Sequence, residues 1–211
     1  GAEQLANRIV SSLGQIEGYK LRTGKMLNND WKRFNEAVSQ LSNANLYIDD
    51  TPGVSIGEIR AKCRRLASSP NGLDLVIIDY LQLISGGKNY GANRQQEVAD
   101  ISRNLKTLAM ELHIPVIALA QLSRNVEGRE DKRPMLSDLR ESGSIEQDAD
   151  LVGFLYRDDY YSKEAKNDAT SISEFIIAKH RNGPQATIQL LFKKDTSTFL
   201  NMARPDKKEV E

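Results

Sequence analysis

The 211-residue chain contains 29 lysine and arginine residues and 29 aspartate and glutamate residues, so its formal net charge at pH 7 is zero. This balance excludes a strongly basic nucleic-acid-binding domain, and any contact with DNA or RNA must come from local loops or from several copies around the ligand. The single cysteine excludes an intrachain disulfide and a cysteine-based zinc site, and no apolar run approaches the 18 residues of a membrane span.

Two amphipathic helices are predicted in the first 45 residues. The first has apolar residues at four-residue spacing, namely Leu5, Ile9 and Leu13. Asn29 and Asp30 can cap the second helix. Its apolar stripe, which we expect to lie in the core, consists of Trp31, Phe34, Val38 and Leu41.

Residues 46–50 (LYIDD) predict a short strand, and a third helix follows it. Ser55 and Glu58 have the spacing of a capping box, and we expect the helix that they begin to end near Leu66. The basic residues of this helix form either a solvated face or a subunit contact, and they are Arg60, Lys62, Arg64 and Arg65.

The middle of the chain predicts a βαβ unit. Residues 75–78 (LVII) are four apolar residues without alternation, which favours a strand covered on both faces in a parallel sheet. A glycine-rich loop follows at 85–93, a long helix at about 94–112, and a second apolar strand after Ile114. Because one long helix joins two buried strands, we expect the strands to be parallel.

Each of these two strands ends in a polar residue, Asp79 and Gln121. Ligands of open α/β sheets bind outside the carboxyl ends of the strands, so Asp79 is well placed to hold a metal-bound phosphate, directly or through water. The alternative is that Asp79 caps the next turn. A strand ending in Asp followed by one ending in Gln is typical of nucleotide hydrolysis in P-loop folds, where the carboxylate serves Mg²⁺ and the second residue senses the γ-phosphate.

The phosphate loop of that fold, GxxxxGK[ST], is absent from the sequence. The nearest stretch, residues 18–26 (GYKLRTGKM), has its first glycine one position too far away, carries Met26 in place of the hydroxyl residue, and follows no strand. We therefore expect either a fragment whose phosphate-binding part is missing or a domain with another purpose.

Residues 123–148 are polar and densely charged, and a loop of this length in a compact domain is usually functional or disordered. Strands are predicted at about 151–156, 172–180 and 186–193, with the turn RNGP at 181–184 making a hairpin of the last two.

Six blocks of sequence resemble the bacterial replicative DNA helicases of the DnaB family. They are IDYLQLI (78–84), ANRQQEVADISR (92–103), IPVIALAQLSR (114–124), DKRPMLSDLRESGSIEQDAD (131–150), FLYRDDYY (154–161) and AKHRNGP (178–184). The resemblance implies that residues 1–204 are a partial RecA-like domain of the α/β class, with a mostly parallel sheet flanked by helices, a C-terminal β-hairpin and the N-terminal part of the fold absent. Residues 205–211 are then a charged, disordered tail.

The resemblance also implies roles for individual residues. Asp79 matches the Walker B aspartate that holds Mg²⁺, and Gln121 matches the residue that couples the γ-phosphate to the DNA-facing loops. Lys179 and Arg181 match the cationic pair that enters the ATP site of a neighbouring subunit, Arg181 being the arginine finger. His180 stands where the family commonly has glutamine. The rival interpretation of this segment is a basic hairpin tip.

Contact with single-stranded DNA is implied for Arg140, Glu141 and Gly143, with the 85–93 loop as a second candidate. A glycine can bring its backbone N–H close to a phosphate, and an arginine can contact phosphate or organise the neighbouring glutamate.

The resemblance further implies that the phosphate loop and the catalytic glutamate lie before Gly1. The parent protein is then an ATP-dependent, Mg²⁺-requiring DNA helicase, a cytoplasmic homohexamer that works with a primase and a helicase loader and not with a membrane, whereas this chain alone hydrolyses no ATP. Two alternatives remain open: a RecA-family recombination or repair ATPase, and a non-catalytic module that binds a partner through residues 55–67.

Overall fold

The computed structural model describes residues 1–87, 90, 93–139, 143–161 and 168–202. The chain divides into two compact units. One comprises residues 1–50, 155–176 and the segment from 187 onward, and the other comprises residues 51–154 and 177–186. The predicted tail at 205–211 lies outside the described residues.

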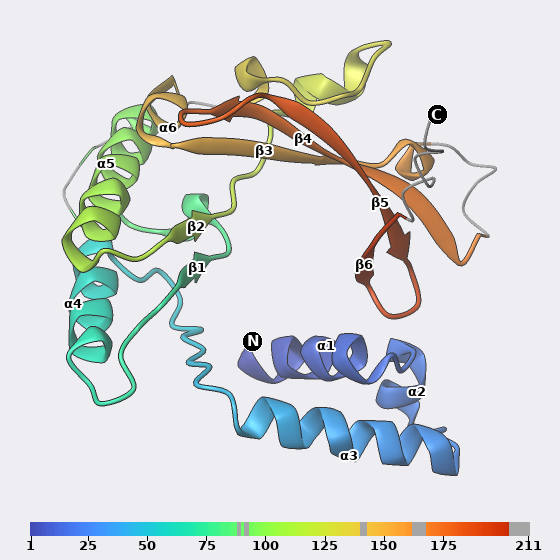
Figure 1. The fold of residues 1–211 in the computed structure, drawn as a ribbon. Helices are drawn as coiled ribbons and strands as arrows, with labels where there is room; N and C mark the ends of the chain where they lie inside the picture. Colours follow the sequence, from blue (N-terminus) through green and yellow to red (C-terminus); the bar gives the residue numbers. More distant parts are fainter. Residues whose placement is uncertain (88–89, 91–92, 140–142, 162–167, 203–211) are drawn as a thin grey trace, which may run out of the picture. The chain divides into compact units, whose positions relative to one another are not determined.

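The first unit begins with three helices, α1 (Ala2–Gly14), α2 (Gly18–Thr23) and α3 (Asn28–Ser42), and α1 packs against α3 (Figure 1). The two predicted helices are thus confirmed. The predicted cap is misplaced, because Leu27 is the N-cap and Asn29 and Asp30 lie within the first turn of α3. The Asp30 carboxylate accepts hydrogen bonds there from the Leu27 backbone N–H (3.1 Å) and from Arg33 (2.5 Å). Both donors stabilise the first turn of the helix.

The prediction that the apolar stripe of α3 lies in the core is wrong for Trp31, which is 47% exposed and packs edge-on against Phe34 of its own helix. The helix buries the small residue Ala37 instead. The physical reason is close approach of the two helices, since a Cβ atom on Gly14 of α1 would lie 3.3 Å from the Arg33 carbonyl oxygen. Where two helices approach this closely, small side chains fit between them and bulky side chains lie at the edge of the contact.

The strand predicted at residues 46–50 is also wrong, because these residues form no strand. Leu46 and Tyr47 are about half exposed, and the Asp50 carboxylate accepts a hydrogen bond from the Ala2 backbone N–H (2.9 Å). A short strand is stable only when a neighbouring strand satisfies its backbone N–H and C=O groups. The composition of residues 46–50 favours a strand but does not show whether such a partner strand is present.

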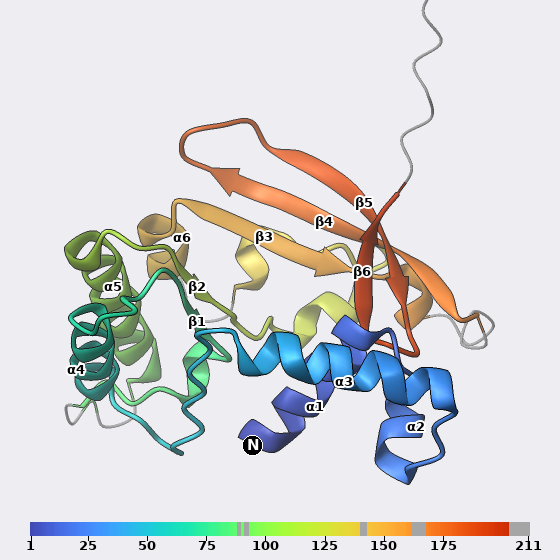
Figure 2. The ribbon, with the colours of Figure 1, turned by 60° about the horizontal axis from the view of Figure 1, so that its bottom comes forward.

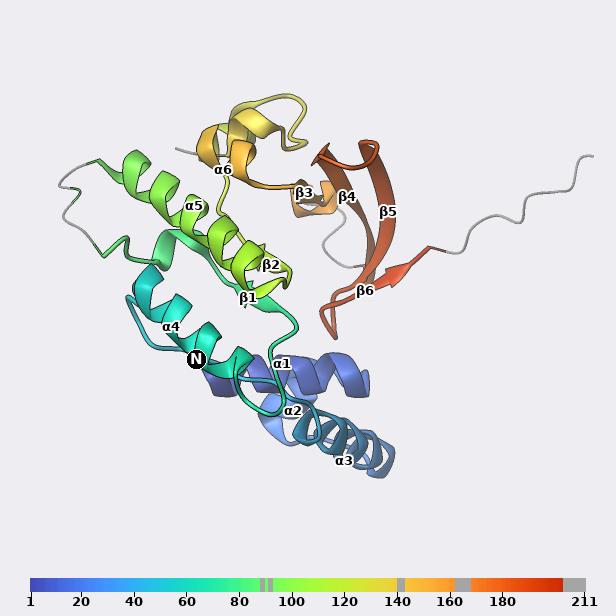
Figure 3. The ribbon, with the colours of Figure 1, turned by 60° about the vertical axis from the view of Figure 1, so that its left-hand side comes forward.

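The second unit contains the βαβ arrangement that the sequence predicts. Strand β1 (Val76–Ile78) pairs in parallel with β2 (Val116–Ala118), with Val76 opposite Val116. Helices α4 (Ile56–Ala67) and α5 (Arg94–Leu112) lie on the same side of this pair (Figures 1 and 3). The capping box of Ser55 and Glu58 is present, with hydrogen bonds of 2.8 and 3.2 Å.

The core of this unit lies between the helices and one face of the strand pair. Its buried residues are Ile56, Leu81, Ile84, Ile101 and Leu105, with Ile78 and Val116 packed against them. On the opposite face, Ile77 and Ile117 are 61% and 48% exposed. The expectation of a strand covered on both faces is therefore wrong for β1, because the described residues bury the face toward α4 and α5 and leave Ile77 largely exposed.

The described parts of segment 123–148 contain more regular structure than a long loop. It contains two short 3₁₀ helices, η2 (Arg124–Gly128) and η3 (Leu136–Asp138), and the helix α6 (Gly143–Asp148). The Asp138 carboxylate is buried, and it accepts hydrogen bonds from Arg129 (2.6 Å) and from the Met135 backbone N–H (2.9 Å). Another 3₁₀ helix, η1 (Leu81–Leu83), follows β1.

The remaining strands form one sheet in the order β3-β4-β5-β6. They are β3 (Leu151–Tyr156), β4 (Thr170–His180), β5 (Ala186–Lys193) and β6 (Thr198–Asn201), with η4 (Asp158–Tyr160) following β3. Figure 2 shows β4 and β5 joined by their turn, which confirms the predicted hairpin. β5 and β6 are antiparallel, with Leu191 opposite Leu200. The α/β class is confirmed, with the parallel pairing in β1 and β2.

Among the described residues, every helix is too short or too polar to span a lipid bilayer.

The packing of α5 predicts a clear stability difference. Ile101→Ala should lower the free energy of unfolding by about 2–5 kcal/mol, because the side chain is 1% exposed and truncation leaves a cavity. Met110→Ala on the same helix, where the side chain is 65% exposed, should change it by less than about 0.5 kcal/mol. Urea denaturation monitored by circular dichroism measures both, and equal losses would contradict this assignment of the core.

Candidate functional site

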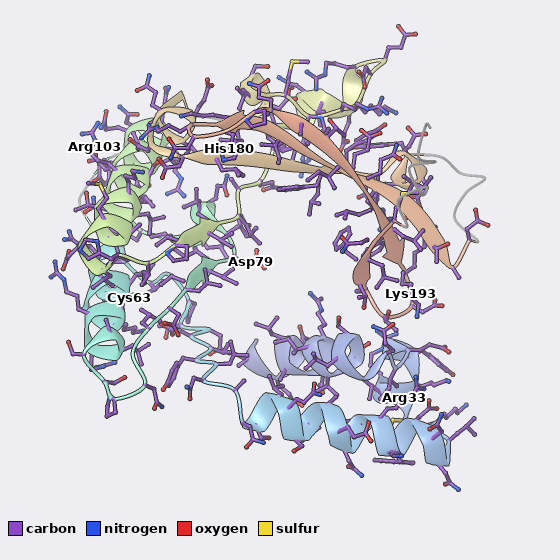
Figure 4. All side chains as sticks on the ribbon, viewed as in Figure 1. Arg33, Cys63, Asp79, Arg103, His180 and Lys193 are labelled. Carbon is purple, nitrogen blue, oxygen red and sulfur yellow. The ribbon has the colours of Figure 1, made fainter. Side chains whose placement is uncertain are left out.

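Asp79 lies directly after β1, at the carboxyl end of the parallel pair, and it is exposed (Figure 4). The backbone on either side of it is fixed by ladder hydrogen bonds to the neighbouring strand. Leu119 N–H donates to the Ile78 carbonyl (2.9 Å), and Leu81 N–H donates to the Leu119 carbonyl (2.9 Å). A carboxylate thus stands on a rigid support at the edge where α/β sheets bind ligands.

Gln121 follows β2 and is exposed at the same end of the strand pair. Its main chain is held by the side chain of Gln82, which donates to the Gln121 carbonyl and accepts from the Gln121 N–H, both at 3.3 Å. Because these bonds use the backbone of Gln121, its side chain stays available to a ligand. The sequence reasoning missed Gln82, although it lies only three residues after Asp79.

A chain of contacts extends from Gln82 to the glycine-rich loop. Arg94, at the start of α5, donates to the Gln82 carbonyl (2.7 Å) and to Glu97 (2.5 Å). Glu97 in turn accepts a hydrogen bond from the Gly86 backbone N–H (2.8 Å). That N–H and the Arg94 guanidinium hold the pKa of the Glu97 carboxyl below its ordinary value.

A Cβ atom at Gly86 would lie 2.4 Å from the Tyr90 ring and 2.9 Å from Glu97 Cγ, so a larger residue there would displace one or both of these side chains. The Tyr90 hydroxyl donates to Asp100 of α5 (2.9 Å). The described part of the 85–93 loop is therefore attached to α5 at two points. Residues 88–89 and 91–92 lie outside the described residues, so the second DNA-contact candidate stays a prediction.

Lys179 and Arg181 lie at the end of β4 and both contact the C-terminal end of α6. Lys179 Nζ donates to the Glu146 and Gln147 carbonyls, the latter at 3.3 Å. Arg181 donates through Nη2 to the Gln147 carbonyl (3.1 Å) and pairs through Nη1 with Asp150 (3.1 Å). The last carbonyls of a helix lack partners within the helix and carry partial negative charge, which favours cations there.

The structure thus brings the predicted site residues together as two separate pairs. Asp79 and Gln121 share the carboxyl end of the β1–β2 pair, whereas Lys179 and Arg181 share the Gln147 carbonyl of α6, and Arg181 alone of these two pairs with Asp150. Gly143 is the first residue of α6, so it begins the same helix whose other end holds the two cations. Arg140 and Glu141 lie outside the described residues.

The chain matches the family model described as the DnaB-like helicase C terminal domain over residues 1–201. It belongs to this family. Its relatives include "Replicative DNA helicase DnaC" of Bacillus subtilis, 57% identical over 97% of the chain, and "Replicative DNA helicase DnaB" of Geobacillus stearothermophilus, 57% identical over 96%. The chain spans 44% of the length of each of these two curated relatives.

Two solved structures show the same fold. One is a DnaB-like replicative helicase described with its interactions with primase, and the other is described as an ATPase domain. Each matches with a TM-score of 0.88 and 44% identity over 96% of the chain, which covers 50% and 72% of their respective lengths. The RecA-like fold implied by the sequence blocks is therefore confirmed.

For a DnaB-like domain, the residues around Asp79 fit a Mg²⁺ ion held mainly by its nucleotide. Among the described residues, no cluster of three or more His, Cys, Asp or Glu side chains could hold a metal by itself. Mg²⁺ at nucleotide sites is usually bound through one or two carboxylates, with phosphates and water completing the shell. A single exposed carboxylate at a strand end meets that requirement.

The basic face of α4 is partly engaged within the chain. Arg64 pairs with Glu111 of α5 at 2.6 Å, and Arg60 pairs with the same carboxylate at 3.3 Å. Two of the four basic residues thus hold α4 against α5, which weakens the alternative of a partner-binding module on this helix.

The Glu97 contacts predict a pH-dependent contribution to stability. Because folding lowers the pKa of Glu97, its contribution is fully present above the unfolded pKa of about 4.3 and is lost as the pH falls through the folded value. Glu97→Gln should therefore lower the free energy of unfolding near pH 7 by on the order of 1 kcal/mol. The difference from the unmodified chain should shrink as the pH is lowered from about 7 to about 3, because the carboxylate becomes protonated in both states.

Urea denaturation at both pH values measures this effect. Glu127→Gln, at an exposed position in the same unit, is the matched control and should show little change at either pH. A Glu97→Gln loss that stayed constant across the pH range would contradict the role of the ionised carboxylate.

Proposed function

We propose that the chain is part of a hexameric replicative DNA helicase that couples ATP hydrolysis to movement along single-stranded DNA and to unwinding at the replication fork. The observation that carries this proposal is the family match over residues 1–201, together with the exposed Asp79 and Gln121 at one strand edge. The same match disfavours a RecA-family recombination or repair ATPase.

In the proposed ATP site, Asp79 holds the Mg²⁺ ion that accompanies ATP, directly or through water. Gln121 reports the state of the γ-phosphate, and Gln82 keeps its main chain in place. The bound metal ion supplies charge compensation for the phosphates. The residues that cradle the phosphates and activate water come from the remainder of the longer protein, since the chain contains no GxxxxGK[ST] motif.

Lys179 and Arg181 act on the ATP of a neighbouring subunit. Their contacts support this role, because they involve α6 and Asp150 and not the Asp79 edge of their own chain. About half of the Arg181 side chain is exposed, so it can reach an anion outside its own subunit. An arginine in this position stabilises charge on the phosphoryl group during transfer.

DNA contact falls on Arg140, Glu141 and Gly143, with loop 85–93 as a second surface. Six subunits, each placing a few such groups around one strand, need no strongly basic domain, which agrees with the net charge of zero. The proposed partners are single-stranded DNA, five further copies of the protein, a helicase loader and a primase, in the cytoplasm. One solved relative is described with primase interactions, which supports the last partner.

The arginine finger predicts a specific kinetic defect. In the full-length protein, Arg181→Ala should lower the rate of ATP hydrolysis by about 10³–10⁵ while leaving nucleotide affinity nearly unchanged, because the residue acts on a neighbour's transition state. Steady-state ATPase assays and equilibrium binding of a fluorescent ATP analogue measure the two quantities. Arg22→Ala, at an exposed position on α2, is the control and should retain activity. Parallel loss of binding and hydrolysis would contradict action in trans.

The DNA-facing segment predicts a salt-dependent defect. Arg140→Ala in the full-length protein should weaken binding to single-stranded DNA uniformly across sequences and reduce the slope of log affinity against log salt by about 1. Fluorescence anisotropy with a labelled oligonucleotide at several salt concentrations measures both, with Arg22→Ala again as the control. An unchanged affinity at every salt concentration would show that Arg140 does not contact phosphate.

A further inference from the structure

Arg181 is held at three points by residues from outside its own strand. Its backbone N–H donates to the Asp150 carbonyl (2.8 Å), Nη1 pairs with Asp150 Oδ1 (3.1 Å), and Nη2 donates to the Gln147 carbonyl (3.1 Å). An arginine at a turn has many rotamers, and contacts at both main chain and guanidinium select a small set of them. Asp150 supplies two of these three contacts.

Asp150 is in turn held from α5. Lys106 Nζ lies 2.5 Å from Asp150 Oδ2, so one carboxylate oxygen faces Lys106 and the other faces Arg181. The hydrogen bond from Lys106 is the main cause that lowers the pKa of Asp150, and the positive charges of Arg181 and Lys179 add to it. The carboxylate is therefore ionised at neutral pH and attracts the guanidinium.

Lys179 contacts the same end of α6 as Arg181. Lys179 contacts the Gln147 carbonyl that also accepts from Arg181, so both side chains converge on one acceptor at the end of α6. Two cations, Lys106 and Arg181, therefore contact the Asp150 carboxylate, and the positive charge of Lys179 also acts on it. Asp150 offsets the repulsion that would otherwise drive Lys179 and Arg181 apart.

These contacts orient the Arg181 guanidinium but leave it accessible to a further ligand. A guanidinium has five N–H donors, and the side-chain contacts to Asp150 and Gln147 use two of them. The Arg181 side chain remains 49% exposed. A charged group that must meet a transferring phosphoryl group benefits from being placed beforehand, since a misplacement of about 1 Å can cost about 10²-fold in rate.

We propose that Asp150 is a positioning residue for the arginine finger, anchored by Lys106 and acting on catalysis only through Arg181. This inference rests on the proposed function, in which Arg181 serves the ATP site of a neighbouring subunit. Asp150 touches neither nucleotide nor metal in this scheme. It fixes the direction from which Arg181 approaches the phosphates.

The test is Asp150→Asn in the full-length hexameric protein, which keeps the size of the side chain and removes its charge. We expect kcat for DNA-stimulated ATP hydrolysis to fall about 10- to 100-fold with KM for ATP within about twofold, because only the approach of Arg181 in the transition state is disturbed. Asp148→Asn makes the same charge change two residues away and should retain kcat. Asp150→Glu should recover part of the loss.

A double-mutant cycle separates positioning from general stability. In single-turnover assays on the Arg181→Ala background, Asp150→Asn should cause no further loss, since the group that it positions is already gone. Equal losses with and without Arg181, or an equal loss in Asp148→Asn, would overturn the inference. Lys106→Met should lower kcat in the same direction but less, and it tests the anchor even if Asp150→Asn assembles poorly.

The two proposals fail in different ways. If the unmodified full-length protein shows no DNA-stimulated ATP hydrolysis, the proposed function fails and this inference falls with it. If the unmodified protein is active and Asp150→Asn matches its kcat, the function stands and only the role of Asp150 is overturned.

Discussion

Packing of α5 against the β1–β2 pair is the constraint on which the candidate site depends. Ile101 and Leu105 of α5 join the core that also contains Leu81, and this contact holds two parallel strands beside one helix. Since parallel strands end at the same edge, Asp79 and Gln121 must emerge together. The position of the candidate site thus follows from apolar burial and does not depend on any attraction between the polar residues themselves.

Polar residues of α5 contact both the surroundings of Gln121 and those of Arg181. At its N-terminal end, Arg94 contacts Gln82 and Glu97 contacts Gly86, so the helix sets the surroundings of Gln121 and the start of loop 85–93. Further along the same helix, Lys106 contacts Asp150 beside Arg181. A helix is stiff along its axis, so one element holds both the residues proposed to serve the chain's own nucleotide and the cation proposed to serve a neighbour's.

The sequence predicts those features whose signal is local and long. The α5 pattern spans the whole helix and gives its bounds, and the apolar run before Asp79 places the end of β1. The second strand is shorter than predicted, because β2 ends at Ala118, three residues before Gln121. Prediction from the sequence fails where tertiary contact decides the outcome. Residues 46–50 have strand composition but no strand, and the bulky Trp31 is displaced from a helix contact made by small residues. An apolar run also does not reveal that only one face of β1 is buried in this chain.

The residues that hold the site residues in place could not be predicted from the sequence either. Gln82 and Gln121 are 39 residues apart, and Lys106 and Asp150 are 44 apart, so neither pairing leaves a periodic signal. Within α6 the distances are short instead, because four steps of about 1.5 Å each place Gly143 about 6 Å along the axis from Gln147, whose carbonyl both cations contact. Because α6 is this short, the proposed DNA contact at Gly143 would lie within about one and a half turns of the Gln147 carbonyl. The proposed DNA contact and the arginine finger are therefore close in space, although Gly143 and Arg181 are far apart in the sequence.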